Sequence, residues 1–312
     1  MKKSVLTITL NPSVDKSSSV QNIVPRLKLR CKAPKHEAGG GGINVSRGLA
    51  RLGISSDVFF TSGGRTGQLL EEILQTERLH TFPLDISTET RENFTVTDTV
   101  SKEQYRFIFP GGKLTLKEQK KITDFVDRIN PCPDFVVFSG SLPPGVDPIF
   151  LSQLVNKCKA KGSNVIVDTS GEALKTAIEA GLFLIKPSVR ELSAFVGKDK
   201  LEDSEIEQAA QRIISRGKAK IVVVSLGSGG AVLFSENEKI QVAAPVVKVK
   251  STVGAGDSMV AGMLSVLING GDHKKMISMG IACGSAATMT EGTGLFTKEN
   301  AERLFNDIQN QK

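Results

Sequence analysis

Aromatic residues are scarce in this chain. Its 312 residues include no tryptophan and one tyrosine, and aromatic side chains make up 5% of the total. Proteins that bind single-stranded nucleic acid stack the bases on aromatic side chains, usually interleaved with basic ones. The formal charge is +7, but without such interleaving, a basic run or a known motif we expect no nucleic-acid partner. The surplus charge fits general solubility and the attraction of anionic substrates, such as phosphates, equally well.

Cysteine pairs and long apolar runs are also missing. The four cysteines form no Cys-x-x-Cys pair, so the sequence indicates neither a disulfide framework nor a zinc site. No run approaches the roughly 18 apolar residues of a membrane span, and the first apolar stretch is too short for a secretory signal. We therefore expect buried, reduced thiols, no membrane partner and a cytoplasmic location.

Two common nucleotide-binding motifs are absent. No G-x-G-x-x-G follows the first predicted strand, which disfavours a nicotinamide-dependent enzyme, and no G-x-x-x-x-G-K-[ST] occurs, which excludes a P-loop kinase. Instead, from about residue 134 onward, continuous β-branched runs alternate with amphipathic segments. This pattern predicts parallel strands covered by helices on both faces, with ligands at the carboxyl ends of the strands. Four polar residues stand at such ends: Ser139, Asp168, Lys186 and Ser225.

Two segments break this rhythm, at about residues 14–36 and 91–110. The second alternates polar and apolar residues as a hairpin does. We predict that both form a small sheet inserted into a single domain of residues 1–312, as a lid over a substrate cleft. The alternative is an ordinary edge hairpin. A small sheet with exposed edges invites covering, so we expect a homodimer through this lid.

The strongest local signal is the small-residue turn STVGAGDS at residues 251–258, which precedes an apolar helical segment. Such a helix start binds anions through its free N–H groups and the helix dipole. A carboxylate beside a bound phosphate would repel it, so we expect the carboxylate to have a role. Asp257 is suited to take a proton from an attacking hydroxyl while the amides hold a phosphoryl group. The alternative is that Asp257 merely caps the helix.

A second signal is the run of four glycines at residues 39–42, which precedes another helical pattern. Four consecutive glycines cost too much backbone entropy to be filler inside folded structure. They permit a ligand to approach the backbone closely, although alone they could equally form a flexible loop.

These two motifs, in this order, resemble the signatures of the ribokinase-like (PfkB) family of carbohydrate kinases. The matching residues are 39–53 and 251–265, and LTITLNPSVD at 6–15 and SGSLPPG at 139–145 resemble its phosphosugar-kinase branch. The resemblance spans essentially the whole chain. It implies a ribokinase-like three-layer α/β/α fold with a central, mostly parallel sheet and a small inserted β-sheet lid. It also implies a kinase that uses ATP and Mg²⁺.

The resemblance further implies roles for individual residues. Asp257 would be the catalytic base, and Glu191 would help to position Mg²⁺ through water. The anion hole for the γ-phosphate would be formed by the amides of Gly254, Ala255 and Gly256. The nucleotide would contact Lys186, Ser225, Gly227 and Gly230. The sugar phosphate would be held by Asp15, Gly40, Gly41, Asn44, Arg91, Arg106 and Ser141, with Lys28 and Arg30 supplied from a partner's lid.

Four of these residues have plainer alternatives. A lysine after a buried strand, like Lys186, is more often solvated. Arg91 and Arg106, on alternating strands, would ordinarily be surface charges, and Asp15 follows Asn-Pro as a turn residue does. The family's Asn-x-x-Glu element also departs here, because Ser188 stands where asparagine is usual.

Gly41 bears on the substrate. Relatives that act on fructose 1-phosphate or tagatose 6-phosphate commonly have lysine at this turn, and in lacking it the chain is similar to minor-type bacterial 6-phosphofructokinases. The resemblance therefore implies phosphorylation of fructose 6-phosphate to fructose 1,6-bisphosphate. The alternatives are a 1-phosphofructokinase, a tagatose-6-phosphate kinase and, more remotely, a non-catalytic phosphosugar-binding protein. Val24 replaces an aromatic residue near the lid, so we expect weak or absent inhibition by ATP.

Overall fold

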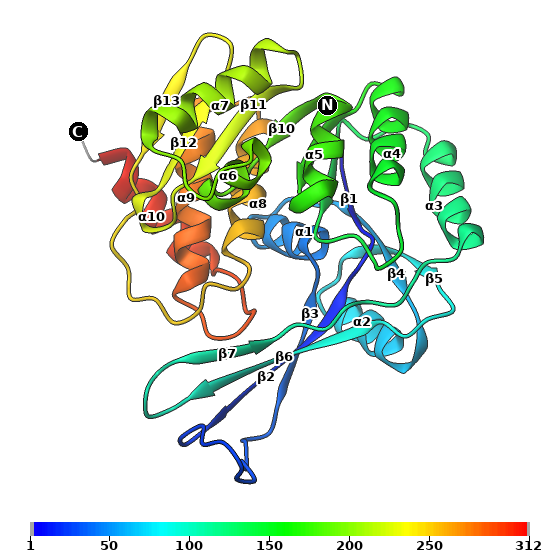
Figure 1. Cartoon of the computed structure of the whole chain (residues 1–312), viewed down its shortest axis with the longest axis vertical. Coiled ribbons are helices and arrows are strands. Elements are labelled where there is room, and N and C mark those ends of the chain that lie inside the picture. The colour runs from blue at the N-terminus through cyan, green and yellow to red at the C-terminus, as the bar shows by residue number, and fades with distance from the viewer. Residues whose placement is uncertain (1–2, 311–312) are drawn as a thin grey trace.

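A mostly parallel sheet forms the centre of the protein (Figure 1). The computed structural model describes residues 3–310, and within them this sheet has nine strands. Their spatial order is β13 (Lys239–Val242), β12 (Ala231–Phe234), β11 (Ala219–Ser225), β10 (Leu182–Ile185), β9 (Asn164–Asp168), β8 (Phe135–Ser139), β1 (Val5–Thr9), β4 (Asp57–Ser62) and β5 (His80–Asp85). All neighbouring strands pair in parallel except β12, which pairs in antiparallel fashion with both β11 and β13. The predicted fold class is confirmed.

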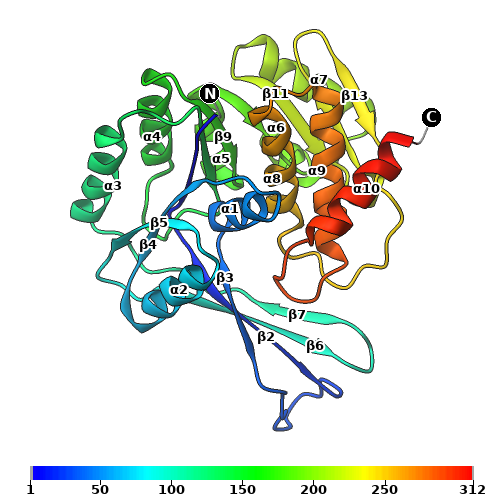
Figure 2. The ribbon, with the colours of Figure 1, turned by 180° about the vertical axis from the view of Figure 1, so that it is seen from behind.

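Helices cover both faces of this sheet (Figure 2). One face carries α3 (Leu116–Arg128), α4 (Pro148–Ala160), α5 (Gly171–Glu179), α6 (Val189–Val196) and α7 (Asp203–Ser215). The other carries α1 (Gly41–Arg51), α8 (Ala255–Ile268), α9 (His273–Thr288) and α10 (Lys298–Asn310). Successive residues of a strand point to opposite faces, so Val136 belongs to the first core and Val137 to the second. This two-sided burial explains the continuous apolar runs in the sequence.

A second sheet projects from the body (Figures 1 and 2). Its order is β3 (Lys35–Gly39), β2 (Ser13–Val20), β6 (Arg91–Asp98) and β7 (Gln104–Phe107). The two central strands, β2 and β6, pair in parallel, whereas the outer strands pair with them in antiparallel fashion. At the base of the sheet, Val14 and Ala38 pack against Leu70 and Leu74 of α2 (Gly64–Thr76). The sheet is thus fixed at one end and extends from the body at the other.

Helices α8 and α9 pack closely through glycine. A β-carbon at Gly262 would lie 2.5 Å from the Met279 carbonyl oxygen, and one at Gly280 would lie 2.6 Å from Met263 Cγ. Glycine permits this approach of the two backbones. At the start of α8, a β-carbon at Gly284 would lie 3.2 Å from the Ala255 carbonyl oxygen, so α9 also packs closely against the first turn.

The cysteines correct one expectation. Cys158 and Cys283 are buried as predicted, and burial raises the pKa of the Cys158 thiol to about 12. Cys31, however, is exposed, because it lies in the loop between β2 and β3 at the free end of the second sheet, and Cys132 is only half-buried. Within residues 3–310, no helix is both long and apolar enough to cross a membrane.

Candidate active site

Three of the four polar residues predicted at strand ends converge on one cleft, and the fourth, Ser225, lines the cavity beside it. Ser139, Asp168 and Lys186 follow the neighbouring strands β8, β9 and β10, and they line a cavity of about 290 Å³ together with Asp257 from α8. Strand order reverses between β1 and β8. Ligands of open α/β sheets bind at the carboxyl ends of the strands beside such a reversal.

The start of α8 is shaped by glycine. Gly254 is the N-cap residue with φ of 73°, and a β-carbon there would lie 2.6 Å from Leu295 Cδ2. In the described part of the chain, no side chain caps this helix. The Asp257 carboxylate instead accepts hydrogen bonds from Asn44 Nδ2 at 2.9 Å and Ser139 Oγ at 3.4 Å. The capping alternative for Asp257 is therefore wrong.

The environment of Asp257 raises its proton affinity. Burial, reinforced by the negative charge of Asp168, raises the pKa of Asp257 to about 7. The hydrogen bonds from Asn44 and Ser139 and the charge of Lys186 act in the opposite direction. A carboxylate with a pKa near neutrality is suited to general base catalysis.

Lys186 is buried in an ion pair. Its side chain is 6% exposed, and its Nζ lies 3.2 Å from Asp168 Oδ1. Burial alone would lower the pKa of Lys186, but the attraction of Asp168, supported by Glu191 and Asp257, raises it. Burial in turn raises the pKa of Asp168 against the opposing charge of Lys186. The solvated alternative for Lys186 is therefore wrong, and the ammonium group stays charged at neutral pH.

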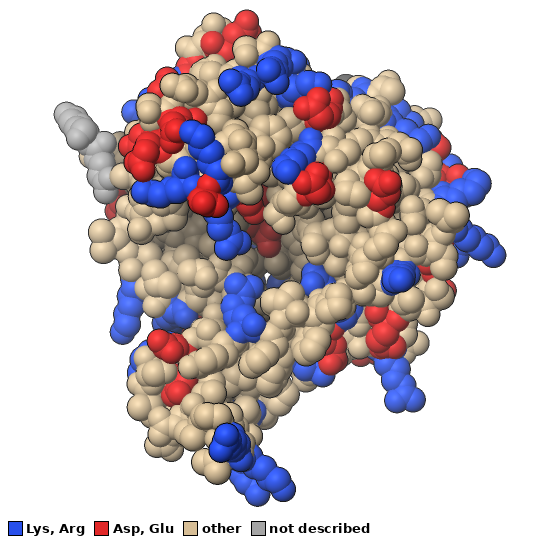
Figure 3. All heavy atoms as spheres, in the orientation of Figure 1, with Lys and Arg blue, Asp and Glu red and all other residues tan. Residues whose placement is uncertain are grey.

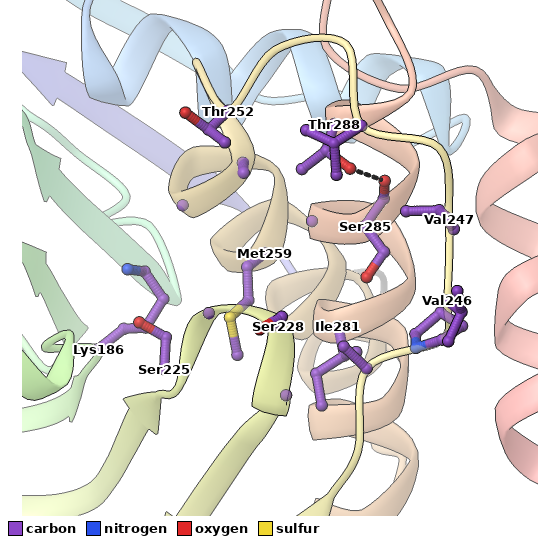
Figure 4. A pocket seen from close by; sticks show the side chains of 18 residues that line it. Lys186, Ser225, Ser228, Val246, Val247, Thr252, Met259, Ile281, Ser285 and Thr288 are labelled. Atoms are coloured by element: carbon purple, nitrogen blue, oxygen red, sulfur yellow. Dashed lines mark hydrogen bonds between the residues drawn. The ribbon is translucent and has the colours of Figure 1, made fainter.

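A larger cavity of about 500 Å³ adjoins the cleft (Figure 4). Its lining includes the predicted residues Ser225, Gly227 and Gly230, and its walls are largely apolar. The apolar residues come from α8, α9 and the segment after β13: Met259, Ile281, Val246, Val247 and Val249. Such walls suit a flat aromatic ring. Lys186 and Gly256 line both cavities, so a ligand that spans them must pass the start of α8.

Glu191 is oriented by Ser188. Ser188 Oγ accepts a hydrogen bond from the Glu191 amide at 3.2 Å, and Glu191 Oε2 accepts bonds from the Ser188 amide and hydroxyl at 2.8 and 2.9 Å. Glu191 lines the same cavity as Asp257. Within residues 3–310, no three or more His, Cys, Asp or Glu side chains are grouped so that they could hold a metal ion by themselves. A Mg²⁺ ion here would take most of its ligands from phosphates and water, as Mg²⁺ commonly does.

The glycine run brings α1 against the end of β8. Gly40 has φ of 118°, and a β-carbon at Gly41 would lie 2.2 Å from Ser139 Oγ and 2.7 Å from the Gly140 amide nitrogen. This turn therefore requires glycine at 41 in the observed backbone. It also sets the first turn of α1 so that Asn44 reaches Asp257.

Asp15 is held at the junction of the two sheets. Its Oδ1 accepts hydrogen bonds from Ser13 Oγ at 2.7 Å and Asn93 Nδ2 at 2.8 Å. A β-carbon at Gly39 would lie 2.6 Å from the Asp15 carboxylate. The side chain thus lies beside the glycine run and is ordered by its neighbours on the second sheet.

Asn11 links Arg91 to Ser141, although the sequence pattern did not single it out as a site residue. Asn11 donates from Nδ2 to Ser141 Oγ at 3.0 Å, and its carbonyl accepts from Arg91 Nη2 at 3.0 Å. Arg91 also donates to the Phe109 carbonyl at 3.1 Å. Its Nε is buried without a partner in residues 3–310. The surface-charge alternative for Arg91 is therefore wrong, because the arginine is fixed beside Ser141.

The remaining predicted cations are exposed and line neither cavity. In the part of the chain that the structure describes, the residues lining the two cavities do not include Lys28, Arg30 or Arg106. All three are exposed on the second sheet or its loop. Figure 3 shows the hollow between this sheet and the body, with Lys and Arg side chains along its rim and at the free end of the sheet.

The chain is similar to known sugar kinases over almost its whole length. The sequence pattern of the pfkB family carbohydrate kinases matches residues 5–300. The ATP-dependent 6-phosphofructokinase isozyme 2 of Escherichia coli (strain K12) is 42% identical over 302 residues, which cover 96% of this chain and 97% of that protein.

Solved structures of similar kinases have the same fold as this chain. The crystal structure of E. coli phosphofructokinase-2 in complex with fructose-6-phosphate matches with a TM-score of 0.93 and 40% identity, covering 98% of this chain and 99% of that one.

Two other sugar kinases are less similar in sequence. A tagatose-6-phosphate kinase of Staphylococcus epidermidis is 30% identical, and each chain is covered to 98%. A 1-phosphofructokinase of Bacillus subtilis is also 30% identical at the same coverage.

Proposed function

Because the chain belongs to the pfkB family of carbohydrate kinases, we propose that it transfers the γ-phosphoryl group of ATP to the 1-hydroxyl of fructose 6-phosphate. The observation that carries this proposal is the meeting of the two cavities at Lys186 and Gly256, beside Asp257. A nucleotide in the larger cavity would present its terminal phosphate there. The higher identity to the 6-phosphofructokinase than to the other sugar kinases supports fructose 6-phosphate as the acceptor.

The reaction joins one oxygen to phosphorus and releases another. Asp257 takes the proton of the 1-hydroxyl, and the resulting oxygen forms a bond to the γ-phosphorus. The bond between the γ-phosphorus and the β–γ bridging oxygen breaks, and ADP leaves with the electron pair. Charge on the transferring group is stabilised by Lys186 and the amides of Gly254, Ala255 and Gly256.

Magnesium fits this site through Glu191. The carboxylate is aimed by its bonds to Ser188 and lines the cleft beside Asp168 and Asp257, so a cation there meets favourable charge. Bound Mg²⁺ would neutralise charge on the ATP phosphates. The residue that holds it would be Glu191, through water.

The acceptor's own phosphate would lie against the second sheet. Arg91 and Ser141 are fixed close together there, and Arg106 lies on the next strand, while Asp15 and Asn44 would bind sugar hydroxyls near Gly40 and Gly41. Arginine suits this role because its fork donates two parallel hydrogen bonds to phosphate oxygens.

A homodimer would complete this part of the site. Phe107, Ile108 and Phe109 are each more than half exposed near the edge strand β7. A sheet edge with exposed apolar side chains favours pairing with another chain. Pairing of two such sheets would let Lys28 and Arg30 of one copy reach the cleft of the other.

The substrate comparison tests this proposal. Purified protein with Mg-ATP would be offered fructose 6-phosphate, tagatose 6-phosphate and fructose 1-phosphate in parallel, and ADP release would be measured. We expect the highest kcat/KM with fructose 6-phosphate. A preference for another of the three would keep the mechanism and overturn the assigned acceptor, whereas no turnover on any would contradict the proposed function.

ATP should inhibit this enzyme weakly or not at all. Val24, the position where similar kinases carry an aromatic residue, is 41% exposed in the loop after β2. An aliphatic side chain cannot stack on a second nucleotide ring as an aromatic one does. Initial rates at fixed, low fructose 6-phosphate should rise to a plateau as Mg-ATP increases. A pronounced fall at high Mg-ATP would contradict the expectation.

A further inference from the structure

Arg47 lies one helical turn after Asn44 on α1 and is buried. Its side chain is 4% exposed, and its Nε donates to both carboxylate oxygens of Glu77 at 2.8 and 2.9 Å. Its Nη1 donates to the Ala38 carbonyl at 2.9 Å and to Asn44 Oδ1 at 3.2 Å. The Asn44 amide continues the chain of contacts, since its Nδ2 donates to Asp257. A connected path therefore runs from the end of α2 to the proposed base.

The chemistry of arginine gives this path a direction. A guanidinium group has five donors and no acceptor, so it meets only the oxygen end of an amide. With Oδ1 facing Arg47, the NH₂ group of Asn44 must face Asp257. We propose that Arg47, held by Glu77, is a positioning residue that fixes the Asn44 amide so that it donates to the catalytic base. This inference rests on the proposed function only in naming Asp257 as that base.

Without the Arg47 guanidinium, the side-chain amide of Asn44 is free to flip, so that its oxygen and its NH₂ group exchange places. Its oxygen would then face the carboxylate of Asp257, and two acceptors in contact repel each other. The hydrogen bond from Asn44 lowers the pKa of Asp257, so its loss would raise that pKa. A base that holds its proton at working pH cannot accept another.

Other charges also act on the two ends of this path. Asp257 faces Asp168 and Lys186 across the cleft. Arg47 is paired with Glu77 and lies near Arg51, whose pKa is also affected by Glu37. The bond to Ala38 ties Arg47 to the residue that precedes the glycine run. A purely structural role, in which Arg47 only fastens α1 to α2 and β3, is therefore the competing explanation.

The pH profile of Arg47→Met separates the two explanations. We expect the acidic limb of kcat/KM for fructose 6-phosphate to move up by about one pH unit, which is about what one charge-assisted hydrogen bond contributes. Activity relative to wild type should then be about ten-fold lower at pH 6 than at pH 9. A purely structural role predicts the same loss at every pH, and that result would overturn the proposal.

Arg51→Met provides a matched control. Arg51 is the next arginine along the same helix, it is partly buried, and it donates to the carbonyls of Gly294 and Phe296 rather than to Asn44. Its replacement removes a comparable side chain from α1. We expect the acidic limb of this variant to stay at the wild-type pH, whatever happens to kcat.

A double-mutant cycle tests whether Arg47 acts through Asn44. In an Asn44→Ala background the amide is gone, so Arg47→Met should move the acidic limb no further. A further shift of similar size in that background would show that Arg47 acts on Asp257 by another route and would overturn the assignment.

A measurement without substrate separates this inference from the proposed function. In ligand-free wild type, the side-chain NH₂ signal of Asn44, followed by NMR, should shift with pH as Asp257 titrates, at a pKa of about 7. In Arg47→Met that coupling should be lost. If the wild type turned over no sugar phosphate but showed the coupling, the proposed function would fail and the positioning role would stand. Coupling retained in the variant would overturn the positioning role.

Discussion

Asp257→Asn is expected to lower kcat for fructose 6-phosphate by roughly 10²- to 10⁴-fold. Asparagine has the same shape but no lone pair that accepts a proton at neutral pH, so the 1-hydroxyl must lose its proton to water. The start of α8 and Lys186 remain in place, which leaves residual turnover from binding and charge stabilisation. Initial rates of ADP release, with KM measured for both substrates, would show the effect in kcat. Turnover within ten-fold of wild type would contradict the role of Asp257.

Thermal unfolding of the same variant serves as its control. Burial and the charge of Asp168 raise the pKa of Asp257 to about 7 in the folded protein, above the value of an unfolded chain. Such a group stabilises the fold most at low pH, and this contribution is lost as the pH rises towards and through 7. The neutral asparagine avoids that loss. We therefore expect the variant to melt at a higher temperature than wild type at pH 8, with the difference shrinking towards pH 4.

Lys186→Met is expected to lower both kcat and the free energy of unfolding. The variant loses the charge that faces the transferring phosphoryl group, which should lower kcat by about 10²-fold or more. It also leaves Asp168 without its partner in a buried site, at a cost of about 3–5 kcal/mol in the free energy of unfolding at pH 8. Because burial raises the pKa of Asp168, the destabilisation should be smaller at pH 5, where that carboxylate can take up a proton. Denaturant unfolding at the two pH values would measure it.

The double variant Asp168→Asn/Lys186→Met distinguishes the two losses. Neutralising both members of the pair removes the unpaired buried charge, so most of the lost stability should return. The missing ammonium is not replaced, so kcat should stay low. Recovery of kcat in the double variant would show that Lys186 serves only to neutralise Asp168 and does not act on the phosphoryl group.

The main sheet and the centre of the site could be predicted from sequence because their signals are local. Strands β8 to β11 are short apolar runs that end in a polar residue or are followed directly by one, and carboxyl ends of parallel strands meet at one edge. The glycines before α8 likewise mark a helix start that is open to anions. These patterns place Lys186 and Asp257 at one edge without any knowledge of which strands are neighbours.

The partners of these residues could not be predicted, because they depend on the order of strands and on packing between distant segments. Lys186 meets Asp168 only because β9 and β10 are adjacent. Asn44 reaches Asp257 across 213 positions of sequence. Arg47 looks like an ordinary helix-surface cation until α2 places Glu77 beside it.

The local sequence does not determine the positions of Lys28 and Arg30. They lie in the loop between β2 and β3 at the free end of the second sheet, with Cys31 beside them. Nothing in the local pattern fixes where such a loop lies. Their contribution to the sugar site therefore stays a prediction, which the oligomeric state in solution would test.

The separation of the second sheet from the central body bears on how members of the family can diverge in substrate preference. The groups that we propose to handle the phosphoryl group, Lys186 and Asp257, belong to the central sheet and α8, whereas the proposed sugar-phosphate residues Asp15, Arg91 and Arg106 stand on the second sheet. Substitutions that change which sugar is accepted can accumulate on that sheet while the phosphoryl-transfer machinery is inherited unaltered. Sugar preference can therefore change in part through the second sheet, while Gly41, Asn44 and Ser141 link it to the central body.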